Sequence, residues 1–186
     1  MIEKVTMPKS VLLDANVIIE AYKLGIWEKL LDRINALVPS TVAHDEALFF
    51  RRGKIPQPID LMRLIRIGKI NELSTTVAEL GSLQSVFDRV FVQGLDSGEL
   101  EALALIKADR VGTALYCTGD AAAIRALAMI GHSGFGISME MLLKETGLQK
   151  YLNNQFTEKF FKEKIAEGQE NLITGRGLRE KKSLQR

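Results

Sequence analysis

Four carboxylates of this chain occupy positions that could bring them together, although they are far apart in the sequence. They are Asp14, Glu46, Glu99 and Asp120. Each follows an expected strand or lies near the start of an expected helix, and the carboxyl ends of parallel strands in an α/β sheet open onto one crevice. Oxygen ligands gathered there favour Mg²⁺ or Mn²⁺, since the two histidines of the chain lack the spacing of zinc ligands.

The hydrophobic pattern alternates short apolar runs with helical periodicity. The expected buried strands are residues 9–15, 36–39, 69–73, 114–118 and 134–137. The expected helices are residues 17–31, 41–52, 59–67, 75–93, 99–108, 121–130 and 139–168. Strands that alternate with helices indicate a parallel sheet with helices on its faces. We therefore predict a three-layer α/β/α sandwich with a central, mainly parallel sheet of about five strands.

Each of the four acids also has a purely structural explanation, because acidic side chains commonly cap helices. Asp14 and Asp120 can each be the N-cap of the helix that follows. Glu99 lies three residues after Asp96 and can complete a variant of the capping box. Glu46 has no basic partner at helical spacing, and a metal ligand or a glutamate at a helix edge explains it equally well.

Electrostatic repulsion distinguishes a shared site from four separate caps. Two unit charges about 5 Å apart in an effective dielectric of about 20 repel by roughly 3 kcal/mol, and four converging acids contain several such pairs. A divalent cation turns this repulsion into attraction. If the fold brings the four carboxylates together, the site is therefore expected to bind Mg²⁺ or Mn²⁺.

The composition is typical of a globular domain. The chain has 186 residues, of which 46% are hydrophobic and 26% charged. A chain of this length buries roughly 70% of the surface that its unfolded form exposes. The single cysteine, Cys117, allows no intrachain disulfide, which fits a reducing cytoplasm. The sequence shows no secretory signal and no apolar run of about 18 residues, so we expect a cytoplasmic protein without a membrane segment.

Positive charge is concentrated near the C-terminus. Residues 175–186 carry a net charge of +4, which leaves −2 for the rest of a chain whose net charge is +2. A weakly acidic body with a basic end could hold a metal ion and attract a polyanion, although short basic tails are often only solvated. Further candidates for contacts with nucleic-acid phosphates are Arg51, Arg52 and Arg125.

The segments around the acids resemble the PIN-domain nuclease family, which includes many toxins of toxin–antitoxin pairs. The matching segments are VLLDANVI at residues 11–18, VPSTVAHDE at 38–46, GELEALA at 98–104 and YCTGD at 116–120. The Gly-Glu-x-Glu-Ala form is similar to a bacterial and archaeal subgroup. Each motif alone is weak, but all four in this order over residues 10–147 are fairly specific.

The resemblance implies a function and a role for each matching residue. It implies a metal-dependent endoribonuclease in which the catalytic and metal-binding acids are Asp14, Glu46, Glu99 and Asp120. The supporting polar residues would be Asn16 and Thr118, and Glu101 would be the alternative to Glu99 as the third ligand. Residues 1–147 would form the nuclease domain, and residues 148–186 a helical extension with a basic tail. The implied partners are RNA, a small antitoxin protein and a second copy of the chain.

Other function classes fit the same residues less well. An aspartyl phosphatase needs a second acid two residues after the first, where this chain has Asn16. A phospho-receiver domain needs paired acids and a late lysine, and the chain has neither at a convincing spacing. The main alternative outside enzymes is a PIN-like interaction module that keeps the fold without activity. Retention of all four acids favours the nuclease.

Overall fold

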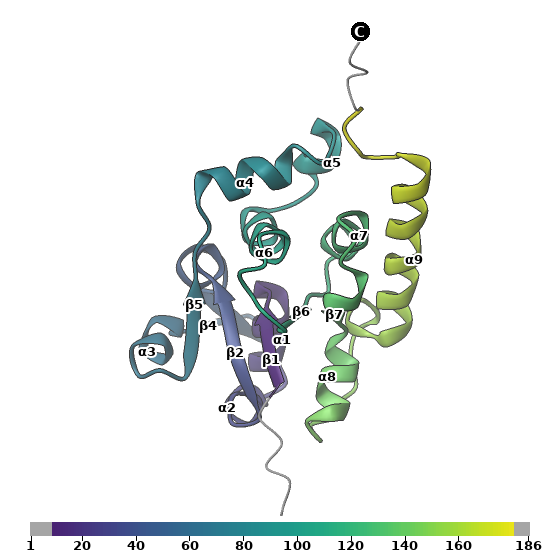
Figure 1. Ribbon diagram of the computed structural model, residues 1–186. Helices are drawn as coiled ribbons and strands as arrows, with labels where there is room; N and C mark the ends of the chain where they lie inside the picture. Colours follow the sequence, from purple (N-terminus) through teal and green to yellow (C-terminus); the bar gives the residue numbers. More distant parts are fainter. Residues whose placement is uncertain (1–8, 181–186) are drawn as a thin grey trace, which may run out of the picture.

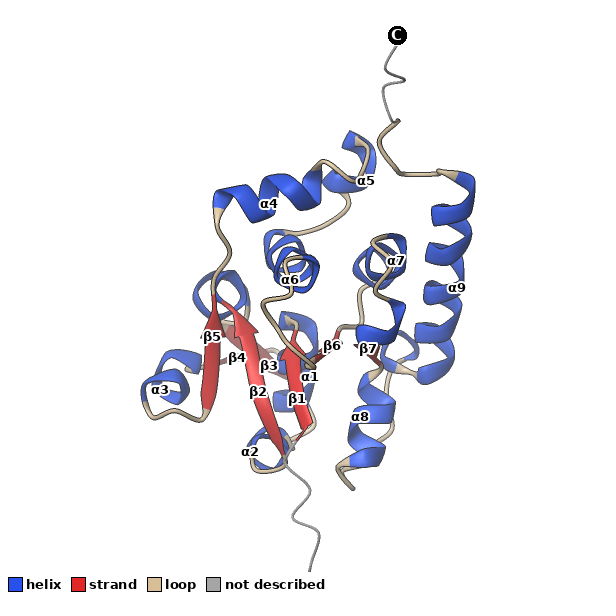
Figure 2. Ribbon diagram, in the orientation of Figure 1, coloured by secondary structure: helices blue, strands red, loops and turns tan. Residues whose placement is uncertain are grey.

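A five-stranded sheet lies at the centre of the computed structural model, which describes residues 9–180. Its strands run in the order β5-β2-β1-β6-β7, and each is parallel to its neighbours. Their bounds are Lys9–Leu13 for β1, Ile34–Pro39 for β2, Ile70–Leu73 for β5, Leu115–Cys117 for β6 and Gly136–Ile137 for β7. Helices cover both faces (Figure 1; Figure 2). The predicted three-layer α/β/α sandwich is confirmed.

Strand β1 shows how the sequence separates the two helical layers. Val11 and Leu13 belong to one hydrophobic cluster and Leu12 to the other, because successive side chains of a strand point to opposite faces. The first cluster includes side chains from α1 (Ala15–Lys23), α2 (Trp27–Leu31) and α8 (Met139–Glu145), among other elements. The second cluster contains α6 (Ser97–Lys107) and α7 (Ala121–Met129). Strand β1 is thus buried on both faces, and full burial of each apolar side chain contributes roughly 1.5–3 kcal/mol.

The remaining helices pack around this frame. Their bounds are Leu61–Arg66 for α3, Val77–Gln84 for α4, Arg89–Gln93 for α5 and Glu158–Thr174 for α9. Helix α4 packs against α6, and α9 runs alongside α7 (Figure 1). Short 3₁₀ turns occupy Ser133–Phe135 and Asn154–Phe156. Within residues 9–180, no helix combines the length and the apolar character that a bilayer-spanning segment requires.

Three predicted long helices are each divided into two shorter ones, namely those at residues 17–31, 75–93 and 139–168. Between α1 and α2, Gly25 adopts a φ of +66°. After α8, Gly147 adopts the same φ of +66°. A left-handed glycine of this kind ends a helix. Between α4 and α5, the carboxylate of Asp88 accepts a hydrogen bond from the Phe91 amide and so starts a new helix.

The prediction of a helix at residues 41–52 is wrong. Only one π-helical turn, η1 (Val42–Glu46), forms, and an antiparallel hairpin of β3 (Phe49–Arg52) and β4 (Ile55–Pro58) follows it. The turn between the strands contains Gly53 with a φ of +64°, a conformation that side chains disfavour. Aromatic residues in β3 and two prolines in β4 also suit a short hairpin better than a helix.

The C-terminal extension packs closely against the rest of the domain. A Cβ atom at Gly168 of α9 would overlap the backbone oxygen of Arg125 in α7 and would lie 2.8 Å from the Ala128 Cβ. After α9, Leu178 forms an antiparallel bridge with Phe87. Part of the predicted basic tail, residues 181–186, lies outside the described residues.

The close approach of α7 and α9 predicts the effect of a small substitution. Gly168→Ala is expected to lower the free energy of unfolding by about 1–3 kcal/mol, because the added methyl group forces the two helices apart. Urea unfolding measures this change. Gly81→Ala in α4 is the matched control, because a Cβ there meets nothing within 4 Å. It should stabilise the protein by about 0.5–1 kcal/mol, and equal effects of both changes would contradict the proposed packing.

Candidate active site

Two of the predicted acids follow neighbouring strands of the sheet. Asp14 comes directly after β1, and Asp120 lies three residues after β6, which pairs with β1. The hydroxyl of Thr118 donates a hydrogen bond to Oδ2 of Asp14 at 2.6 Å and accepts one from the Asp120 amide at 3.0 Å. Asp14 and Thr118 are each 2% exposed. The structure therefore brings these acids together through one buried hydroxyl group.

The predicted supporting residue Asn16 completes this link. Its side-chain amide donates to Oγ1 of Thr118 at 3.4 Å, and its Oδ1 accepts a hydrogen bond from the backbone amide of Gly119 at 3.1 Å. Asn16 lies in the first turn of α1, whereas Thr118 and Gly119 follow β6. The side chain thus fixes the loop after β6 against the start of α1.

Glu46 contacts the start of α6, the helix that carries Glu99. Oε1 of Glu46 accepts a hydrogen bond from the Gly98 amide at 2.8 Å, while its Oε2 is buried without a hydrogen-bond partner among the described residues. The approach depends on glycine, since a Cβ at position 98 would overlap Oε2 of Glu46. Glu99 is the next residue and is 3% exposed. The first turn of α6 therefore contains both Glu99 and the Gly98 amide that binds Glu46.

The expected capping interactions are also present. Asp14 accepts from the Ala15 amide, and Asp120 accepts from the amides of the first turn of α7. Glu99 and Asp96 form a reciprocal capping box, in which Asp96 accepts from the Glu99 amide at 2.8 Å and Glu99 accepts from the Asp96 amide at 3.0 Å. Capping and convergence coexist for Asp14 and Asp120, because each follows a strand of the sheet and caps the helix that comes next.

Burial and, to a smaller extent, neighbouring negative charges raise the pKa of three predicted acids, Asp14, Glu46 and Glu99. Burial, with the charges of Asp96 and Glu46 as smaller causes, raises the pKa of Asp14 from 3.8 to about 7. Burial, followed by the charges of Asp120 and Asp14, raises the pKa of Glu99 from 4.5 to about 9. The pKa of Glu46 is also raised, chiefly by burial. No lysine or arginine within residues 9–180 forms an ion pair with any of these acids.

Sequence reasoning missed two groups at this site. Asp96 was expected only as a helix cap, yet its charge raises the pKa of Asp14, Glu46 and Glu99. Its spacing of three residues from Glu99 was the available signal. The buried hydroxyl of Tyr116 has no hydrogen-bond partner among the described residues. Burial and then the charges of Asp14 and Glu99 raise its pKa well above the usual value.

Glu101 faces a different part of the structure from Glu99. Its two oxygens accept hydrogen bonds from the backbone amides of Thr41 at 2.7 Å and Thr75 at 3.1 Å. These amides belong to the loops that follow β2 and β5, so Glu101 ties both loops to α6. Glu99 instead keeps Oε1 free of hydrogen bonds to described residues. Of the two glutamates, Glu99 is therefore better placed to bind a ligand.

The donor set suits a hard cation, although it does not form a closed cage. Within residues 9–180, no three acidic, histidine or cysteine side chains already surround a common metal position. Mg²⁺ does not require such a cage, because it commonly keeps several waters and binds through one or two carboxylates. The buried Oε2 of Glu46, unpartnered among the described residues, and the Asp14 carboxyl, which has no ion-pair partner within residues 9–180, fit this kind of ion in ligand type.

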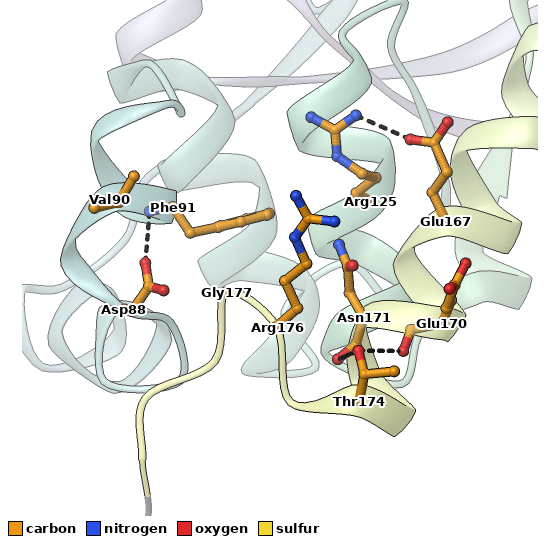
Figure 3. A pocket seen from close by; sticks show the side chains of 10 residues that line it. All are labelled: Asp88, Val90, Phe91, Arg125, Glu167, Glu170, Asn171, Thr174, Arg176 and Gly177. Carbon is orange, nitrogen blue, oxygen red and sulfur yellow. Dashed lines mark hydrogen bonds and ion pairs between the residues drawn. The ribbon is translucent and has the colours of Figure 1, made fainter.

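The predicted RNA-contact residues lie in two different places. Arg51 and Arg52 are exposed on β3, a few residues after Glu46. Arg125 lies in a groove of about 760 Å³ between α5, α7 and α9, where it pairs with Glu167 at 3.2 Å (Figure 3). None of the four predicted acids lines this groove. Arg125 thus lines a groove to which none of the four acids contributes, whereas Arg51 and Arg52 lie on β3 outside that groove.

The contact between Glu46 and Gly98 predicts the effect of a second glycine substitution. Gly98→Ala is expected to displace the Glu46 carboxylate and to lower the free energy of unfolding by about 1–3 kcal/mol, because the methyl group would also lie 2.7 Å from Val42. Thermal unfolding with and without Mn²⁺ tests this expectation, since the variant should lose most of any stabilisation by the ion. Gly134→Ala, where a Cβ meets nothing within 4 Å, should keep it.

Comparison with known proteins assigns no family to the chain. It matches no protein-family model and no curated protein. The geometry of the acids and the motifs that contain them therefore carry the functional argument.

Proposed function

We propose that the protein is an endoribonuclease that hydrolyses RNA phosphodiester bonds with Mg²⁺ or Mn²⁺ as cofactor. One observation carries the proposal: Asp14 and Glu99 are carboxylates, only 2% and 3% exposed, without an ion-pair partner within residues 9–180. Repulsion among neighbouring acids destabilises the folded protein, and a site with only a structural role offers nothing to offset it. Resemblance of four segments to PIN-domain nucleases supports the same function.

The residues of the site have distinct roles in this proposal. The cation would be held by Asp14, Glu46, Glu99 and Asp120. As a Lewis acid it would polarise the attacking water and the scissile phosphate. Thr118 and Asn16 orient Asp14 and the loop that carries Asp120. Once the cation favours the ionised carboxylates, Glu46 or Glu99 can accept a proton from the attacking water.

The reaction follows from these roles. The oxygen of water forms a bond to phosphorus, the bond between phosphorus and the 3′ oxygen breaks, and the leaving oxygen takes up a proton. The products are a 5′-phosphate and a 3′-hydroxyl. The proposal also includes a small antitoxin protein as inhibitor and a homodimer, which the family resemblance implies, and a cytoplasmic location, which fits the single cysteine.

An RNA cleavage assay tests the proposed function. The purified protein is mixed with a labelled unstructured RNA and a labelled hairpin RNA, in Mn²⁺, in Mg²⁺ and in EDTA. Cleavage that requires the ion and leaves a 5′-phosphate is the expected result. Absence of cleavage in all three conditions would favour the alternative of an inactive interaction module, and cleavage in EDTA would remove the role of the cation.

A further inference from the structure

The hairpin of β3 and β4, which begins three residues after Glu46, concentrates positive charge. Residues 47–59 contain three basic residues and no acid, in a chain whose total net charge is only +2. The three are Arg51, Arg52 and Lys54, and all are exposed. None of them forms an ion pair with a residue in the range 9–180. These cations are therefore available to an anionic partner.

The two faces of the hairpin differ in what they contact. Phe50 stacks on Tyr22 of α1 with ring centroids 5.4 Å apart, so this face of β3 points toward the domain. Successive side chains of a strand point to opposite faces, and Phe49 and Arg51 therefore share the outer face. Phe49 is 50% exposed. The outer face thus presents an aromatic ring and a guanidinium group side by side.

The outer edge of the hairpin is unsuited to pairing with another strand. Phe49 pairs with Pro58 and Arg51 pairs with Pro56, and proline has no amide proton to donate. The Ile59 amide donates a hydrogen bond to the Leu48 oxygen at 2.9 Å. Hydrogen-bonded pairs alternate with non-hydrogen-bonded pairs in an antiparallel hairpin, so the pairs that contain Pro58 and Pro56 are not hydrogen-bonded. Both prolines therefore face away from β3 and leave the free edge of β4 without donors at these positions. Side chains, rather than strand addition, must mediate recognition here.

The hairpin lies within reach of a substrate bound at the acids. Arg51 is five residues after Glu46, so the chain places their Cα atoms no more than about 18 Å apart. Protein sites that bind single-stranded nucleic acids without sequence preference cover about four or more nucleotides. They combine cationic side chains for the phosphates with aromatic rings for the bases. The outer face of the hairpin provides both kinds of group.

We propose that this basic hairpin, residues 49–58, binds single-stranded RNA beside the scissile bond. Arg51 on the outer face contacts a phosphate together with the exposed Arg52 and Lys54 at the turn end of the hairpin, and Phe49 stacks on an unpaired base. A duplex keeps its base faces stacked inside, so it cannot use Phe49 in this way. The inference rests on the proposed function for its RNA substrate, and it adds that the substrate is unpaired next to the cleavage site.

Binding measurements in EDTA test the hairpin separately from cleavage. Fluorescence anisotropy gives the affinity of the full chain for a labelled single-stranded RNA and for a duplex at several salt concentrations. The triple variant Arg51→Ala/Arg52→Ala/Lys54→Ala should bind more weakly, and its salt dependence should fall by about 2 in log–log slope, since each phosphate contact on a single strand contributes about 0.7. Phe49→Ala should weaken single-strand binding roughly tenfold and leave duplex binding unchanged.

A control variant removes the same charge elsewhere. Arg63→Ala/Arg66→Ala/Arg89→Ala changes three exposed arginines outside the hairpin and should bind nearly as the wild type does. Equal losses in the two triple variants, or wild-type affinity in Phe49→Ala, would overturn the inference. Circular dichroism and thermal unfolding confirm that each variant is folded. A wild type that binds single-stranded RNA through the hairpin but never cleaves it would overturn the proposed function and support the binding site.

Discussion

Replacing Asp14 by asparagine is expected to abolish cation-dependent RNA cleavage without unfolding the protein. The asparagine side chain keeps the size of Asp14 and can still accept the hydrogen bond from the Ala15 amide. It removes a buried negative charge that the proposed mechanism needs for holding the cation. Stabilisation by a cation contributes several kcal/mol to such reactions, so the rate should fall by roughly 10³-fold or more.

The measurement compares single-turnover cleavage by the wild type, Asp14→Asn and Asp120→Asn at the same Mn²⁺ concentration. Asp109→Asn is the matched control, because Asp109 is exposed and has a φ of 56°, a backbone conformation that asparagine accepts readily. Its rate should equal that of the wild type. Wild-type activity in Asp14→Asn would refute the proposed chemistry, whatever ion the assay contains.

The stability of the protein without a cation is expected to decrease as the pH rises. The pKa of Asp14 is raised from 3.8 to about 7 in the folded state, so the folded protein binds this proton more tightly than the unfolded chain does. The resulting stabilisation is complete below about pH 4 and is lost as the pH rises through about 7. Its size is on the order of 4 kcal/mol. Glu99, whose pKa is raised to about 9, extends the loss to more alkaline pH.

Urea unfolding at several pH values in EDTA measures this loss. Asp14→Asn should be more stable than the wild type at neutral pH and should show a weaker pH dependence between about 4 and 7, because the amide cannot ionise. Mg²⁺ or Mn²⁺ should restore stability, with the largest effect where the carboxylates are ionised. An unchanged pH profile in Asp14→Asn would show that burial does not raise the pKa of Asp14, and no effect of either ion would show that the site does not bind it.

Much of the fold was readable from local sequence patterns. The apolar run that ends at Asp14 predicts a buried strand, and alternation of such runs with helical periodicity predicts a parallel sheet with helices on both faces. The capping box of Asp96 and Glu99 also depends only on residues three apart. These features were predictable because strands, helices and caps are set largely by neighbouring residues.

The composition of the site depended on contacts between distant segments. Glu99 and Glu101 lie on the same helix two residues apart, and only the packing of α6 shows that Glu101 binds the amides of Thr41 and Thr75. The hairpin after Glu46 and the pairing of Arg125 with Glu167 were missed for the same reason. The sequence by itself determined most of the strands and helices and the acidic residues at their ends. The tertiary structure decided which side chains face one another, because burial and long-range hydrogen bonds exist only once distant segments are packed.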